Sequence, residues 1–143
     1  RVHLRERGGD KNTALEDLQI AVLNALKADP AVSAAVDGRI CDGLPVDYPC
    51  ITFGPSDFVP VDLDGIDLRE QSLQIDCWVR AGQKLWPTAV LADKVKAALH
   101  LAELALEDNA LIILTVESVR TFRDPDGLTG HGIVTLSAEI EER

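Results

Sequence analysis

The stretch that decides the fold is residues 69–79, REQSLQIDCWV, in which side-chain character alternates from one residue to the next. On one side of an extended chain lie Leu73, Ile75 and Cys77, and the other side carries polar residues and Trp78. This alternation is typical of a strand with one face on a core and the other toward water or a partner. The sequence therefore predicts a sheet that is covered on one face only.

Two helices are predicted to supply that cover. The first spans residues 13–28, where apolar residues recur at helical spacing and Thr13 and Glu16 match a capping box. The second spans residues 84–99, and Pro87 is tolerated there because it falls in the first turn.

Three more strands are expected, at residues 50–54, 112–123 and 130–140, with the turn sequence Asp-Pro-Asp-Gly at 124–127 joining the last two. Helices and strands in this order predict an α+β fold. We expect an antiparallel β-sheet of about four strands with two main helices packed on one face.

Between the first two strands, residues 56–68 are predicted to form a long loop, and loops of this length are usually functional or mobile. The loop is both acidic and apolar. Its acidic residues are Asp57, Asp62, Asp64 and Asp67, and its large apolar residues are Phe58, Val59, Val61, Leu63 and Ile66. A free monomer gains nothing by exposing such side chains, so we expect the loop to become ordered on assembly. The apolar residues, together with Trp78, are the predicted interface.

Composition points to one ordinary domain. The chain has 143 residues, of which 46% are hydrophobic, and its formal net charge is −10. We expect a single domain over residues 13–143, preceded by a flexible arm at 1–12 that is no secretory signal. So acidic a chain is a poor phosphate binder. Three cysteines without CxxC spacing indicate a reduced, intracellular protein, and no apolar run is long enough for a membrane span.

No arrangement of residues supports catalysis, so we predict no enzyme, no cofactor and no metal. A calcium loop starting at Asp62 would need an oxygen ligand where Ile66 stands and Glu where Leu73 stands. The chain lacks GxSxG, P-loop, GxGxxG and HExxH motifs. For Asp76 we expect a surface or interface role, and for His131 an exposed or capping position.

Several short sequences stand in a distinctive order. They are LKADPAV at 26–32, VDGRI at 36–40, YPCITFG at 48–54, IDCWVRAG at 75–82 and RDPDGLTGHG at 123–132. This succession resembles the phage tail terminator, or tail completion, family, which also occurs in prophages and gene transfer agents. The resemblance runs from about Leu15 to Ala138.

The resemblance implies an α+β subunit of a homo-oligomeric ring, typically of six copies, at the head-proximal end of a tail. The ring would end polymerisation of the tail tube and join the tail to the head connector, with DNA passing through the lumen without specific binding. Its implied partners are the major tail tube protein and a head–tail connector or stopper protein. The implied location is the tail of a virion or phage-like particle assembled in the bacterial cytoplasm.

Acidic residues suit a channel that must not grip DNA, and the acidic loop residues are candidates to face the lumen. Two alternatives remain at the level of sequence. One is a head-completion adaptor or tube protein, and the other is a small metal-binding hydrolase that uses the Asp-rich loop.

Overall fold

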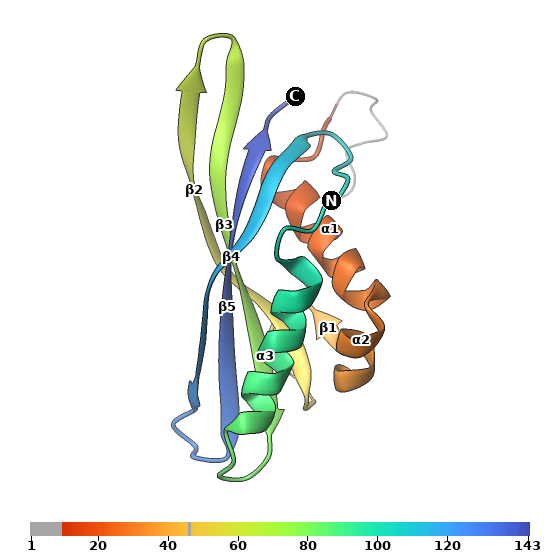
Figure 1. Cartoon of the computed structure of the whole chain (residues 1–143), viewed down its shortest axis with the longest axis vertical. Coiled ribbons are helices and arrows are strands. Elements are labelled where there is room, and N and C mark those ends of the chain that lie inside the picture. The colour runs from red at the N-terminus through yellow and green to blue at the C-terminus, as the bar shows by residue number, and fades with distance from the viewer. Residues whose placement is uncertain (1–9, 46) are drawn as a thin grey trace.

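The computed structural model describes residues 10–45 and 47–143, so residues 1–9 of the predicted arm lie outside the described range. The elements, in chain order, are α1 (Ala14–Ala28), α2 (Pro30–Val36), β1 (Ile40–Cys41), β2 (Cys50–Leu63), β3 (Ile66–Arg80), α3 (Trp86–Leu99), β4 (Ala110–Arg123) and β5 (Thr129–Glu141). The three helices lie on one side of a single long sheet (Figure 1). The predicted α+β fold is confirmed.

Helix boundaries follow from local chemistry. The Thr13 side chain accepts from the backbone N–H of Glu16, whose carboxylate in turn accepts from the N–H of Thr13. Asp29 ends α1 and caps α2, because its carboxylate accepts from the N–H groups of Ala31 and Val32. The predicted first-turn position of Pro87 in α3 is confirmed.

The sheet has five strands in the order β1-β2-β3-β5-β4, rather than about four. The added strand, β1, is only two residues long and runs parallel to β2 at Ile51 and Thr52. All other pairings are antiparallel, as expected. Because β1 is so short, most of β2 is an outer edge of the sheet.

The prediction of a loop at residues 56–68 is wrong. These residues form the outer part of a β-hairpin, in which β2 and β3 pair continuously from Ser56–Leu73 to Leu63–Ile66 and Gly65 turns the chain with φ +73°. Two prolines of β2 are accommodated by their positions in the sheet. Pro55 sits at a register shift between Phe53 and Ser56, and Pro60 lies on the outer edge strand, where a missing N–H costs little. The hairpin is folded in the single chain, so ordering on assembly is not needed to explain it.

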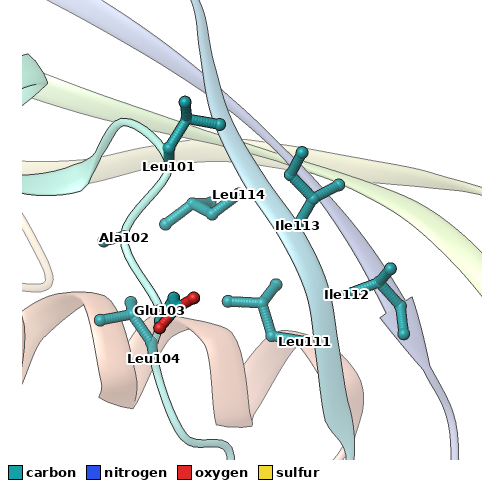
Figure 2. A pocket seen from close by; sticks show the side chains of 8 residues that line it. All are labelled: Leu101, Ala102, Glu103, Leu104, Leu111, Ile112, Ile113 and Leu114. Carbon is teal, nitrogen blue, oxygen red and sulfur yellow. The ribbon is translucent and has the colours of Figure 1, made fainter.

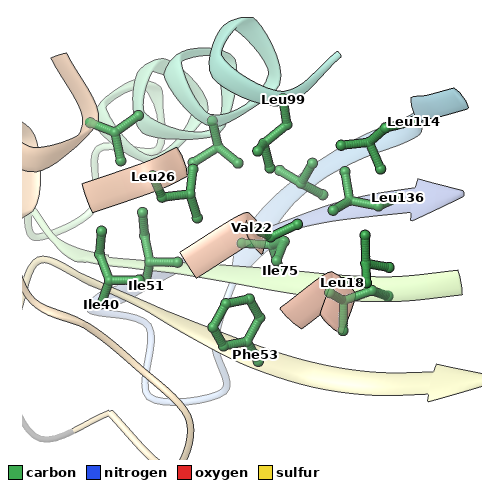
Figure 3. Packing of buried hydrophobic residues seen from close by; sticks show 14 of the residues in the cluster. Leu18, Val22, Leu26, Ile40, Ile51, Phe53, Ile75, Leu99, Leu114 and Leu136 are labelled. Atoms are coloured by element: carbon green, nitrogen blue, oxygen red, sulfur yellow. The ribbon is translucent and has the colours of Figure 1, made fainter. Parts of the chain in front are cut away.

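A single apolar core lies between the helices and one face of the sheet (Figure 3). From α1, Leu18, Val22 and Leu26 point toward the sheet and are fully buried. The sheet contributes Ile75 from β3 and Leu136 from β5, both also fully buried. Aliphatic residues fill this space almost alone, as expected from the scarcity of aromatic residues.

The core also sets the reactivity of the cysteines. Burial raises the pKa of the Cys77 thiol to about 12 and that of the Cys50 thiol to about 11. Only a thiolate reacts fast with a disulfide reagent, and Cys41 alone is exposed. At pH 8 we expect one fast-reacting thiol in the native protein and three after denaturation. The substitution Cys41→Ser should remove the fast phase, and a second fast thiol in the native protein would contradict this assignment.

Candidate assembly surface

One face of the sheet is left uncovered by the helices (Figure 1). We call it the open face. Along β3 it carries the even-numbered residues, because Leu73, Ile75 and Cys77 are buried in the core on the opposite face. In an antiparallel sheet, paired residues point to the same side, so the strand register assigns the remaining side chains of β2, β5 and β4 to one face or the other.

The outer half of the hairpin presents a row of apolar side chains on the open face. Its members follow each other across the β2–β3 register and are Val59, Val61, Leu63, Ile66 and Leu68. We call this row the apolar stripe. In the described chain Val59 is 61% exposed, Leu63 54% and Ile66 41%. Contiguous exposed apolar residues on a hairpin that projects beyond the helices are typical of a surface that a partner covers.

Four of the six predicted interface residues lie in the stripe: Val59, Val61, Leu63 and Ile66. Trp78 is on the same open face, further along β3. Phe58 points to the other side of the hairpin, where the Arg69 guanidinium lies 3.7 Å from the centre of its ring. The structure thus brings five of the six onto one face and separates Phe58 from them.

The predicted acidic residues are divided between the two faces. Asp57 is on the open face, where it is hydrogen-bonded to the Ser72 hydroxyl. Asp62 and Asp67 are cross-strand neighbours on the opposite face, and Asp64 stands beside Gly65 in the turn. Within residues 10–45 and 47–143, no group of three or more His, Cys, Asp or Glu side chains is placed to hold a metal ion.

The end of the open face away from the hairpin turn holds a polar and aromatic cluster. His131 stacks on Trp78 with ring centroids 3.9 Å apart and touches Phe122 at 4.9 Å. Its Nε2 lies 2.6 Å from Oδ1 of Asp76, which also accepts from the Gln74 amide at 2.9 Å. The Trp78 indole N–H donates to the Thr52 hydroxyl at 2.9 Å.

This cluster corrects two predictions. His131 is neither exposed nor a capping residue, and Asp76 is only 5% exposed. The reason is that the His131 ring from β5 and the Gln74 amide from β3 itself lie against the carboxylate, so the sheet buries it without help from a helix. Glycine at position 54 on β2 provides the space for the Asp76 carboxylate. A Cβ atom at Gly54 would lie 2.5 Å from Asp76 Oδ2.

A hollow lies elsewhere, at the outer edge of β4 (Figure 2). It has a volume of about 430 Å³ and is lined by residues 101–104 and 111–114. Its side chains are aliphatic apart from Glu103. The segment is held to the strand because the Leu101 N–H donates to the Leu114 carbonyl at 2.9 Å. A hollow with one carboxylate offers no set of converging polar groups for catalysis.

The family of tail completion protein gp17 matches residues 20–141, which include every strand and most of the helical layer. The chain belongs to this family. It is therefore a structural tail-completion protein rather than an enzyme. A search of curated proteins found no significant match to this sequence.

Two solved structures have a similar fold. A chain from the virion of a native gene transfer agent particle superposes with a TM-score of 0.83 at 21% identity, covering 92% of this chain and 99% of that one. The gp17 protein of bacteriophage SPP1 superposes with a TM-score of 0.57 at 18% identity, covering 87% and 89%. Among the residues described here, no helix is both long and apolar enough to cross a membrane.

The alternation that defines the stripe was present in the sequence. Val59, Val61 and Leu63 alternate with Pro60 and Asp62, which is the period of a strand. The stretch was nevertheless predicted to be a long loop, in which acidic residues stand between apolar ones. Nothing in the sequence pointed to the Asp76–His131 contact, because the two residues lie 55 positions apart.

Proposed function

We propose that this tail-completion protein is a subunit of a homo-oligomeric ring, with six copies as the expected number, at the head-proximal end of a phage-like tail. The ring ends polymerisation of the tail tube on one side and meets the head connector or stopper protein on the other. DNA passes through the lumen without being specifically bound. The particle is assembled in the bacterial cytoplasm.

The observation that carries this proposal is an uncovered sheet face that bears an apolar stripe on a projecting hairpin. Exposed aliphatic side chains in such a row are stabilised when another surface removes them from water, at about 25 cal/mol for each Å² buried. A chain of the tail-completion family whose exposed residues favour protein contact is suited to building an assembly. The similar fold of a chain in a gene transfer agent virion supports the same role.

The charge of the chain supports the part of the proposal that concerns DNA. A net charge of −10 repels a polyanion over the range of the Debye length, about 8 Å at physiological ionic strength. Acidic side chains of the hairpin, namely Asp57, Asp62, Asp64 and Asp67, are the candidates for residues near the lumen. A surface of this kind lets DNA pass because it does not hold the phosphates.

The experiment that tests the proposed function adds the purified chain to tail tubes that are still growing. We expect tube length to become fixed, and electron microscopy to show a ring of density at one end of each tube. Tails made without the chain should be overlong and should fail to join heads. Tubes that keep growing at saturating concentrations of the chain would contradict the proposal.

The same experiment separates the alternative functions. Incorporation of the chain along the whole tube would identify a tube protein. Binding to the head connector with no effect on tube length would identify a head-completion adaptor.

A further inference from the structure

The two ends of the open face differ in charge. At the hairpin end, Glu70 on β3 and Glu139 on β5 are directly opposite each other, next to the apolar stripe. Like charges at opposed positions of a sheet destabilise it. Neither carboxylate forms an ion pair with any residue in the described ranges, so the monomer leaves this repulsion uncompensated.

The other end of the open face has the opposite character. Arg120 on β4 is exposed and lies with its guanidinium 5.4 Å from the Phe122 ring centre. It too has no ion-pair partner among the residues that the structure places. Beside it are the rings of Phe122, His131 and Trp78, while the nearby Arg80 is already paired with Asp126 at 3.8 Å.

Arg120 cannot form an ion pair with Glu70 or Glu139 of the same chain. Arg120 is aligned with Ile133 and Asp76, and these residues are six positions along their strands from Glu139 and Glu70. Six residues of a strand span roughly 20 Å. This exceeds the Debye length of about 8 Å at physiological ionic strength. The acidic pair and the arginine can therefore meet only between different molecules.

We propose that the hairpin end of one copy docks on the Arg120 end of the next copy. Arg120 of one subunit lies against Glu70 and Glu139 of its neighbour, and the neighbour's apolar stripe packs on Trp78 and Phe122. This inference rests on the proposed ring function and names the surfaces that join its subunits.

A second copy is the partner because one chain carries both complementary halves. The Arg120 cation complements the charge of the Glu70–Glu139 pair. The aromatic rings beside Arg120 offer an apolar surface to the aliphatic side chains of the stripe. A contact between two different patches is head-to-tail, and head-to-tail contacts repeat from copy to copy. They close into a ring when the rotation between copies closes, and otherwise form an open filament. A contact with a different tail protein would not require both complementary surfaces to be on this chain.

The test uses two charge-reversed chains. One carries Glu70→Lys and Glu139→Lys, and the other carries Arg120→Glu. Each alone places like charges in every contact, so its self-association, measured by sedimentation and light scattering, should be at least about tenfold weaker than that of the wild type. An equimolar mixture should recover association, because alternating chains again oppose unlike charges at each contact.

A matched control reverses two exposed acids on the helix side, Asp93→Lys and Glu103→Lys. It changes the net charge by as much as the pair Glu70→Lys and Glu139→Lys does, and it should leave association intact. Circular dichroism is used to check that each variant is folded. The self-association of either charge-reversed chain tests the contact if that chain is folded. Wild-type protein that stays monomeric at high concentration, alone and beside tail tubes, overturns the inference. So does a species that stops at two copies, which indicates a two-fold contact.

The outcomes separate this inference from the proposed function. If the wild type forms rings and completes tails but the mixture of reversed chains does not recover association, the contact lies elsewhere and the ring function stands. If the wild type neither associates nor fixes tube length, the proposed function fails as well.

Discussion

Replacing Asp17 with alanine is expected to lower the free energy of unfolding by about 3 kcal/mol. Asp17 lies in the first turn of α1 and is only 3% exposed. Its Oδ2 accepts from the backbone N–H groups of Asp108 and Asn109, at 2.8 and 2.9 Å, and from the Asn109 amide at 2.9 Å. Its Oδ1 accepts from the Asn12 amide.

The cost arises because alanine leaves these donors without an acceptor in a place that water does not reach freely. Asn109 is itself buried, and it is the last residue before β4. A hydrogen bond to a charged group contributes about 1.5–3 kcal/mol, and an orphaned buried donor costs a similar amount. Asp17 therefore fastens the start of α1 to the strand at the far edge of the sheet, across more than 90 residues of sequence.

Urea denaturation followed by circular dichroism measures this effect. Asp17→Asn is the matched control, since it keeps the shape and one acceptor oxygen, and it should cost clearly less than Asp17→Ala. Glu16→Ala removes a neighbouring carboxylate that is half-buried and caps the helix, so its cost should be about 1 kcal/mol or less. A loss below 1 kcal/mol for Asp17→Ala would show that the buried network is not intact in solution.

The role of Asp17 illustrates what the sequence could not supply. Local patterns were sufficient for α1, with its Thr13 cap, and for the alternation of β3, because both depend on neighbours within a few residues. Asp17 reads locally as an acidic residue in the first turn of a helix, which is favourable for electrostatic reasons alone. Its long-range partners exist only after the sheet has formed.

The hairpin shows a different limit. Proline lowers the chance of a strand on average, but the cost depends on whether the missing N–H would have faced a partner. Pro60 lies on the outer strand of the sheet, beyond the two residues of β1, and sheet order is not a local property. Sheet order and strand register also decide which side chains share a face. The sequence thus predicted six interface residues without showing that Phe58 points away from the other five.

Replacing three residues of the apolar stripe, Val59→Ser, Leu63→Ser and Ile66→Ser, is expected to abolish tail completion while leaving the domain folded. These side chains are 41–61% exposed in the single chain, so the substitutions should change its stability by little. If a partner covers the stripe, each side chain contributes up to about 1.5–3 kcal/mol of apolar burial to that contact. A total loss of about 4 kcal/mol corresponds to a roughly thousandfold weaker assembly.

Tube length in the presence of the triple variant is the measurement, with thermal unfolding as the check on folding. The control is the pair Ile20→Ser and Val90→Ser, which makes the same kind of change at similarly exposed positions, 50% and 42%, on the helix side. That pair should complete tails normally. Because α1 and α3 cover the opposite face, a selective loss with the triple variant can come only from the open face. Normal tail completion by the triple variant would mean that the stripe stays in water in the assembled particle, and that the hairpin projects for another reason.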